Sequence, residues 1–600
     1  MKAASRHWLY SLSLLLLTAL GLGIRLLNLA EKPLWTDEFS TIVFSLGNSF
    51  LSVPLDQPIS TEVLLEPLRP QGAGPEAVVA NLFRESNHPP LYFLLSHFWL
   101  QLFPILPSGW VSAWAVRLLP AILGALSIPL TFQLGWLAFR SRAAAQVAAA
   151  VMAVSPFGIY LAQEARHYTL PLIWILLSLC CFVVAARHLR ERQVVPISIC
   201  LGWIVVNGLG IATHYFFVFT LGAEAIVLLC LGLVQSWQER GIWYPSAHWR
   251  RIWIVAAGTA AAGLIWWPVL QNIQGGELTR WIYEGNRSGL AWLEPIGQAV
   301  AGWVTMLYLL PIQADSQGVV VLSGVILVLL VLWTFPKLDR GLKVQLLQRD
   351  SRLGVMVLGA FVVSAILLFF SITYLFETDL TGAFRYNFVY FPGAVVLLGA
   401  GLASSWNVAL WIAHSPAGKV SPVLLSLLRV SSRRVVLLVW LLSLLGALTV
   451  VTNLGYQKTH RPDVVAAAIQ SQSQPGATVL VAIPHQTHGQ TGRLMGVALA
   501  LRQMANQTPN PLEPLFLLAH DTQNPRSVMA TLRRTLNQLP RPLDLWLLNF
   551  QTVPNSLVEE LLEQQNCEAE GKSRSVDGYR YRHYRCTEPL ARPTRRPSSE

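Results

Sequence analysis

The sequence predicts an α-helical polytopic membrane protein that ends in a small α/β domain. Three observations lead to this prediction. Of the 600 residues, 53% are hydrophobic and only 13% are charged, whereas soluble proteins carry about 25% charged residues. The mean hydropathy is +0.46. Apolar runs long enough to cross a bilayer follow one another as far as residue 452, and beyond residue 456 short apolar stretches alternate with polar-faced ones.

Each membrane span is justified by a run of about 20 apolar residues. The clear runs are 8–29, 113–139, 143–162, 168–187, 195–213, 214–235, 251–272, 318–335, 353–374, 385–405 and 434–452. Two weaker runs are 90–105 and 296–311. We therefore expect about 11 to 13 transmembrane helices. The first run follows Lys2 and Arg6 without a clean cleavage site, so we interpret it as a retained span rather than a signal peptide.

Basic residues set the predicted orientation, because cytoplasmic loops carry an excess of Lys and Arg. The clusters are Arg140 and Arg142; Arg187, Arg190 and Arg192; Arg240, Arg250 and Arg251; Lys337, Arg340, Lys343, Arg349 and Arg352; and Lys419, Arg429, Arg433 and Arg434. Counting the clear runs alone, all five clusters fall on the side of the N-terminus. Basic cytoplasmic loops therefore account for the net charge of +12, and this charge does not indicate nucleic-acid binding. The sequence predicts a multi-pass protein of the bacterial plasma membrane, with a cytoplasmic N-terminus and an extracytoplasmic C-terminal domain.

The two weaker runs are interpreted as interfacial helices. If 90–105 crossed the bilayer, the Arg140 and Arg187 clusters would face outward, and a crossing at 296–311 would do the same to the Lys337 cluster. The predicted organisation has four parts. These are a membrane domain (1–455), a first outer loop with juxtamembrane helices inside it (30–112), an extracytoplasmic α/β domain (456–590) and a disordered tail (591–600).

Short apolar stretches define the C-terminal domain. Residues 478–483, 515–518 and 543–548 are predicted strands, and 493–504 and 528–538 are predicted helices. Cys567 and Cys586 also lie in this domain. In an oxidising compartment they form a disulfide or remain two free thiols, and we favour the disulfide.

Two adjacent carboxylates, Asp37 and Glu38, directly follow the first span in the stretch Pro-Leu-Trp-Thr-Asp-Glu-Phe. Ionisable groups near lipid are costly and are usually retained for function. Asp37 is accordingly a candidate catalytic carboxylate with Glu38 as its neighbour. The alternative is that both are ordinary solvated loop acids.

Other polar groups fall on the same predicted outer side. They are His88 and Tyr92; Glu164, Arg166, His167 and Tyr168; His214; and Arg385 and Tyr386. Each has a structural alternative: a helix cap for His88, an interfacial ion pair for Glu164 and Arg166, an interfacial anchor for His214, and a snorkelling side chain for Arg385. Their convergence on one side favours a donor- and acceptor-binding site.

This set of groups suits glycosyl transfer from a lipid-linked sugar. A carboxylate can deprotonate an acceptor, a guanidinium can stabilise a leaving phosphate, and an apolar groove between spans can hold a polyprenyl tail. The sequence contains no Gly-rich nucleotide-binding motif. The predicted partners are therefore membrane lipids and a polyprenyl-phosphate sugar donor; the acceptor, whether protein, lipid or glycan, is not identified.

Several of these motifs together resemble bacterial glycosyltransferase family 39. They are Pro-Leu-Trp-Thr-Asp37-Glu38, His88-Pro-Pro-Leu-Tyr92, Arg117-Leu-Leu-Pro-Ala and Ser155-Pro-Phe-Gly-Ile-Tyr-Leu-Ala-Gln-Glu164-Ala-Arg166-His-Tyr168. The family is similar to protein O-mannosyltransferases and to the aminoarabinose transferases of lipid A. The resemblance covers about residues 8–400.

The resemblance implies a GT-C fold, a polyprenyl-phosphate donor and a base in the first outer loop, which maps onto Asp37. It also implies a second acidic position at Glu164 and a basic residue facing the donor phosphate at Arg385. Some relatives bind a divalent metal through such acids, and here Asp37, Glu164 and His88 are the residues that could hold one; no cofactor is otherwise implied. Arg166 departs from the lipid A enzymes, which carry an Asp in this motif without this Arg.

Two alternative functions stay open. One is a glycan ligase or polymerase, which would share the outer-face chemistry. The other is a transporter of a lipid-linked glycan. Transporters place ionisable groups at mid-membrane in repeated halves, whereas here such groups are predicted at span ends and no halves repeat.

Overall fold

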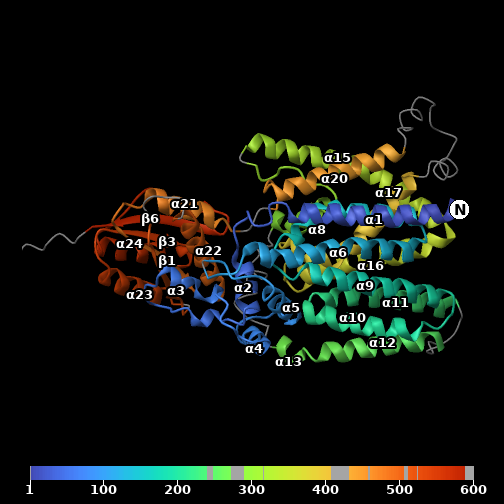
Figure 1. The fold of residues 1–600 in the computed structure, drawn as a ribbon, viewed down its shortest axis with the longest axis horizontal. Helices are drawn as coiled ribbons and strands as arrows, with labels where there is room; N and C mark the ends of the chain where they lie inside the picture. The colour runs from blue at the N-terminus through green and yellow to red at the C-terminus, as the bar shows by residue number, and fades with distance from the viewer. Residues whose placement is uncertain are drawn as a thin grey trace, which may run out of the picture. The chain divides into compact units, whose positions relative to one another are not determined.

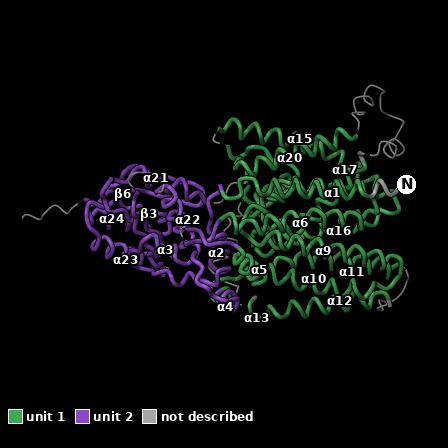
Figure 2. Tube along the Cα trace, viewed as in Figure 1, with its two compact units in different colours: residues 1–30, 82–102, 113–457 green, residues 31–81, 103–112, 458–600 purple. Residues whose placement is uncertain are grey.

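The structure is a computed structural model, and it describes residues 2–107, 109–238, 247–271, 289–314, 316–406, 432–456, 460–505, 511–522 and 524–587. The predicted tail at 591–600 and the basic residues Arg240, Lys419 and Arg429 lie outside the described residues. The chain forms two compact units (Figure 2). The first comprises Met1–Ala30, Leu82–Leu102 and Ala113–Gln457, and the second comprises Glu31–Asn81, Phe103–Ser112 and Lys458–Glu600.

The first unit is helical, and its long helices run side by side (Figure 1). Its elements are α1 (Lys2–Leu26), α5 (Leu91–Leu100), α6 (Ala113–Phe139), α7 (Arg142–Val154), α8 (Pro156–Ala162), α9 (Thr169–Arg190), α10 (Ile197–Thr213), α11 (Phe217–Gln238), α12 (Ala247–Leu264), α13 (Trp267–Gln271), η4 (Gly289–Leu293), α14 (Glu294–Thr305), α15 (Gln317–Leu347), α16 (Arg349–Leu375), η5 (Phe384–Val389), α17 (Phe391–Trp406) and α20 (Ser432–Val451).

Helix length and composition define the candidate spans. Within the described ranges, seven helices are long and apolar enough to cross a membrane, or eight if the bent pair α7 and α8 is one span. This is fewer than the predicted 11 to 13, because several predicted spans form shorter helices, such as α10 and α17. The weak runs form α5, of 10 residues, and α14, of 12 residues. A helix of 10 residues is about 15 Å long, half the hydrocarbon thickness, so α5 alone is too short to cross a bilayer.

The break between α7 and α8 has a local cause. Pro156 disfavours helical backbone at the residue before it, and Ser155 is extended in ψ at 121°, so the two helices meet at 55°. Ser155 caps α8 by accepting a hydrogen bond from the Gly158 N–H at 3.3 Å. The buried Arg25 guanidinium donates to the carbonyls of Met152 and Ala153, both at 3.1 Å, at the end of α7. Backbone groups on both sides of the break therefore have hydrogen-bond partners, and α8 leads directly into the loop that starts at Gln163.

The second unit is an α/β domain with additional N-terminal segments (Figure 1). The latter are α2 (Thr36–Ser45), η1 (Phe50–Ser52), α3 (Thr61–Leu65), η2 (Glu66–Leu68) and most of α4 (Pro75–Glu85). The C-terminal elements are α21 (Pro462–Gln472), β1 (Thr478–His485), α22 (His488–Ala505), β2 (Leu515–His520), α23 (Pro525–Gln538), β3 (Leu543–Leu548), η6 (Phe550–Thr552), α24 (Asn555–Gln564), β4 (Cys567–Ala569), β5 (Arg574–Val576) and β6 (Tyr579–Cys586).

The sheet has the order β2-β1-β3-β6-β4, with β5 also paired to β6. The first three strands are parallel, with Leu480 opposite Leu515 on one side and Leu545 on the other. They occupy the three predicted strand positions, and α22 and α23 occupy the predicted helix positions. The antiparallel strands β4, β5 and β6 were not predicted.

Residues 31–81 belong to this second unit, which differs from the predicted boundary at residue 456. Ile59 forms an antiparallel bridge with Phe516 of β2. The Asp56 carboxylate accepts hydrogen bonds from the His520 N–H at 2.8 Å and from the Thr531 hydroxyl at 3.1 Å. Backbone pairing between segments so far apart has no signature in either segment alone, so composition could not reveal it.

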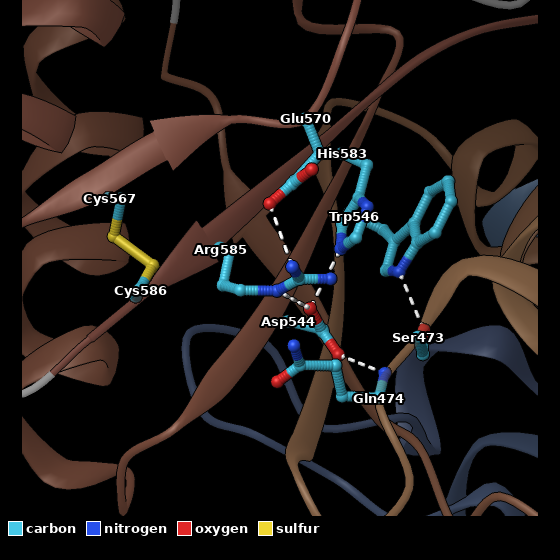
Figure 3. A network of polar contacts seen from close by, with 9 residues as sticks. All are labelled: Ser473, Gln474, Asp544, Trp546, Cys567, Glu570, His583, Arg585 and Cys586. Carbon is cyan, nitrogen blue, oxygen red and sulfur yellow. Dashed lines mark hydrogen bonds and ion pairs between the residues drawn. A yellow bond between two sulfur atoms is a disulfide. The ribbon is translucent and has the colours of Figure 1, made fainter.

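A buried polar network lies within the sheet (Figure 3). The Asp544 carboxylate contacts His583 Nε2 at 2.8 Å and accepts from the Gln474 N–H at 2.6 Å. The Trp546 ring stacks on His583 with centroids 4.3 Å apart. At the edge, Cys567 and Cys586 are opposite each other on β4 and β6 and form a disulfide, which is the pairing that we favour from the sequence.

Candidate functional site

The loop between α8 and α9 provides four of the predicted site residues. Glu164, Arg166, His167 and Tyr168 are all buried, with at most 3% of each exposed. Gln163 fixes the start of this loop, because its amide donates to the carbonyl oxygens of Arg25 at 3.3 Å and Leu27 at 2.7 Å, at the end of α1. A polar loop buried at the ends of apolar helices needs such partners.

Arg166 determines the tautomer of His88. The guanidinium Nη2 lies 3.1 Å from His88 Nε2, and because a guanidinium only donates, His88 Nε2 accepts. The proton of His88 is then on Nδ1, which donates to the Ser86 hydroxyl at 2.9 Å. His88 is therefore a neutral imidazole that orients a positively charged neighbour.

His167 lies at the centre of the cluster. Its ring centroid is 5.2 Å from that of His88, 4.6 Å from His214 and 6.0 Å from Tyr92. The side chain is fully buried, and within the described part of the chain neither ring nitrogen has a hydrogen-bond partner. Burial holds the pKa of His167 well below its usual range, and the Arg166 charge lowers it further.

His214 and η5 close the other side of the cluster. His214 Nδ1 accepts from the Phe216 N–H at 3.0 Å. Burial lowers the pKa of His214 well below its usual range, and the charges of its neighbours, Arg166 and Arg385 included, add to this. Tyr386 lies beside Arg385 on η5 and packs on Phe216 at 4.4 Å. The histidines are thus neutral, and the positive charge of the cluster comes from the two guanidinium groups.

Asp37 and Glu38 are located on the first turn of α2, in the second unit. Glu38 is fully buried, and its Oε2 accepts from the Trp35 N–H at 3.4 Å, as the acidic partner of a capping box. Asp37 is half-buried. The two adjacent acids thus differ. The Glu38 carboxylate is buried and hydrogen-bonded at the start of the helix, whereas the Asp37 carboxylate belongs to the more exposed residue.

The structure therefore groups nine predicted residues in the helical unit. They are His88, Tyr92, Glu164, Arg166, His167, Tyr168, His214, Arg385 and Tyr386. In the part of the chain that is described, no three His, Cys, Asp or Glu side chains are grouped so that they could hold a metal ion.

The sequence reasoning missed several residues in and around this cluster. Phe388 packs on His214 at 5.0 Å and on Tyr168 at 6.0 Å, but an apolar residue in an apolar run gives no signal. Gln163 had a signal, since it is a polar residue at the end of a span. Glu224 was also missed: it is buried within α11 and accepts a hydrogen bond from Ser178 at 2.9 Å. An ionisable group therefore does lie inside a span.

The comparisons with known proteins agree with the architecture. The family model described as dolichyl-phosphate-mannose-protein mannosyltransferase matches residues 104–283. This segment contains α6 to α12 and the loop with Glu164 and Arg166. No curated protein sequence matches the chain significantly.

Solved structures with a similar fold include ArnT from Cupriavidus metallidurans in the apo state. It is 15% identical, with a TM-score of 0.50 over 97% of this chain and 98% of ArnT. ArnT from the same organism bound to undecaprenyl phosphate is 14% identical, with a TM-score of 0.48 over 95% and 97% of the two chains. The Archaeoglobus fulgidus oligosaccharyltransferase in the apo form is 13% identical, with a TM-score of 0.44 over 93% and 73%.

These findings confirm the predicted resemblance and fold class. The apo ArnT likeness extends over nearly the whole of both chains, so the elements of the chain follow the order of a GT-C fold. At this identity the likeness concerns the fold alone. The mannosyltransferase family match supports the predicted class of enzyme, a multi-pass membrane glycosyltransferase.

Proposed function

We propose that this protein transfers a sugar from a polyprenyl-phosphate donor to an acceptor on the extracytoplasmic face of a bacterial plasma membrane. One observation carries the proposal: two guanidinium groups, the buried Arg166 and the half-buried Arg385, belong to one cluster with histidines that are held neutral. Among the nine grouped residues the two guanidinium groups outnumber the single carboxyl group, that of Glu164, which suits a phosphate bound at the ends of membrane helices.

The donor phosphate would be held by Arg166 and Arg385. A guanidinium offers several donors in a planar fork and binds phosphate well in a site of low polarity. Hydrogen bonding by His88 to Arg166 restricts the rotation of that fork. His167 and His214 would be neutral imidazoles beside the phosphate. Each could donate a hydrogen bond to one sugar hydroxyl and accept a hydrogen bond from another.

Asp37 is the proposed general base. Its neighbour Glu38 is fully buried and accepts from the Trp35 N–H at the start of α2, whereas Asp37 is half-buried and the more accessible acid of the pair. In the proposed step, Asp37 removes the proton from an acceptor hydroxyl or amine, and the acceptor atom bonds to the anomeric carbon. The bond from that carbon to the phosphate oxygen breaks, and the polyprenyl phosphate leaves with the electron pair.

The acid-to-amide variant Asp37→Asn tests this proposal. We expect it to insert into the membrane normally, to lose transfer activity at least 100-fold, since general-base catalysis contributes roughly 10²–10⁴-fold, and to retain its bound donor. Native mass spectrometry of the purified variant should then detect a polyprenyl phosphate that carries one sugar. Glu76→Gln, an exposed acid on α4, is the matched control and should stay fully active.

The lipid found on the variant separates the alternatives. A lipid with a long glycan would support a ligase or polymerase instead. Bulk phospholipid alone, on both variant and wild-type protein, would contradict the proposed donor and favour a transporter. Full activity of Asp37→Asn would remove Asp37 as the base.

A further inference from the structure

The helix that bears Asp37 packs on a glycine-containing face of the C-terminal domain. α2 and α22 are in extensive contact within the second unit. Thr36, the residue before Asp37, lies over Gly492 of α22. A β-carbon added to Gly492 would be 3.2 Å from Thr36 Cγ2 and 3.3 Å from Thr36 Cα. These distances are shorter than ordinary van der Waals contacts, so any side chain at this position must displace Thr36.

Aromatic packing fixes the two ends of the same segment. The His488 ring at the start of α22 stacks on Phe50 at 5.0 Å and meets Phe44, at the end of α2, edge-on at 5.8 Å. At the other end, Trp35 packs against His460 at 5.8 Å. Asp37 therefore lies in a helix whose beginning and end both contact residues of the C-terminal domain.

A second set of contacts holds the chain that follows α2. Ile59 pairs with β2 through two backbone hydrogen bonds to Phe516, at 2.9 and 2.8 Å. Glu62 on α3 forms an ion pair with Arg502 of α22. The segment is thus bound along its length, by backbone pairing, aromatic packing and charge.

We propose that the C-terminal α/β domain positions the base, and that Gly492 is the positioning residue through which it does so. This inference rests on the proposed role of Asp37. The domain is then part of the catalytic apparatus. A displacement of 1 Å of a catalytic group can reduce a rate by about 100-fold. A β-carbon at residue 492 requires a shift at Thr36 of a few tenths of an ångström, so the expected reduction in turnover is smaller.

Gly492→Ala and Gly492→Val test the proposal in the full-length protein. We expect kcat to fall about threefold or more with Ala and about tenfold or more with Val, since each displaces α2 further. The KM for the donor should not change, because the proposed phosphate-binding residues are in the helical unit. Adding Thr36→Ser removes Cγ2 but leaves the Thr36 Cα at 3.3 Å, so it should restore only part of the activity of Gly492→Ala.

Gly496→Ala is the matched control. Gly496 lies one turn further along α22, and a β-carbon there would be equally crowded, at 3.2 Å from Pro462 Cβ and 3.3 Å from the Tyr579 hydroxyl. These neighbours belong to the C-terminal domain itself and not to α2. Gly496→Ala should change the stability of the C-terminal domain about as much as Gly492→Ala does, but its kcat should remain near the wild-type value. Equal losses of kcat in the two variants would overturn the proposal.

A labelling measurement reports the position of residue 37 without using activity. Asp37→Cys is reacted with a maleimide in a protein without the four free cysteines, Cys180, Cys181, Cys200 and Cys230, either alone or combined with Gly492→Val or Gly496→Ala. We expect a changed rate with Gly492→Val alone. An unchanged rate overturns the positioning role, whatever the activity. A changed labelling rate combined with full activity of Gly492→Val would support the positioning of residue 37 by the C-terminal domain but contradict Asp37 as the base. Failure of the positioning role and failure of the proposed base therefore give different results.

Discussion

A single side chain defines the protonation state around Arg166. Because Arg166 can only donate, His88 Nε2, 3.1 Å away, must accept, and the single ring N–H, on Nδ1, donates to the Ser86 hydroxyl. His88 is thus a neutral acceptor rather than a cation. The same residue could not be assigned from the sequence, where a helix cap and a functional role were both open.

Substitution of His88 tests this orientation at the residue scale. His88→Leu should raise the donor KM about 10- to 100-fold, because a hydrogen bond to a charged group contributes roughly 1.5–3 kcal/mol. His88→Gln should recover part of this loss, since its amide oxygen can accept from the guanidinium. The donor KM of purified protein in detergent is the measurement. Equal KM values for the two variants would show that His88 acts only through its volume.

At the scale of the elements, the pairing of β3 with β6 depends on a buried carboxylate. Burial raises the pKa of Asp544, but the hydrogen bonds from His583 and from the Gln474 backbone and the Arg585 charge outweigh it, so the pKa is lower than usual. A depressed pKa in the folded state contributes stability that is present above the unfolded pKa of about 3.9 and is lost as the pH falls through the folded value.

Asp544→Asn should therefore destabilise β3 and β6 by about 1–3 kcal/mol at pH 7 and flatten the dependence of their stability on pH below about 4. Hydrogen exchange of peptides from residues 543–548 and 579–586 in the full-length protein measures both effects. Asp577→Asn, an exposed acid in the turn before β6, is the control and should exchange like the wild type. Identical acid profiles for wild type and Asp544→Asn would contradict the role of the network.

At the scale of the whole molecule, the proposed orientation can be tested by labelling in intact cells. In a background without the four free cysteines, Cys180, Cys181, Cys200 and Cys230, we introduce a single cysteine at Arg190 or at Lys572, both exposed. The cysteine at position 572 should react with a membrane-impermeant maleimide, and the one at position 190 should react only after lysis. The opposite pattern would reverse the proposed orientation.

Hydrophobicity and turn chemistry made much of this architecture predictable. Apolar runs located the helices, and the three parallel strands follow the short apolar stretches. Residues of the loop from Glu164 to Tyr168 were found because polar groups stood between apolar runs. The grouping of 31–81 with the C-terminal domain was not predictable, since pairing between Ile59 and Phe516 leaves no mark on either segment. The neutral state of the histidines likewise depends on neighbours that only the fold supplies.

The contact between Asp56 and His520 joins residues 464 positions apart, and this has a consequence for biosynthesis. At about 5–20 residues per second, the segment that contains α2 emerges roughly 25–90 s before the strand on which it is to pack. During this interval Asp37 has no helix from the C-terminal domain to hold it. A chain that stops early, or whose last domain fails to fold, would then lack a positioned base, and the nascent protein would remain inactive until its synthesis is complete.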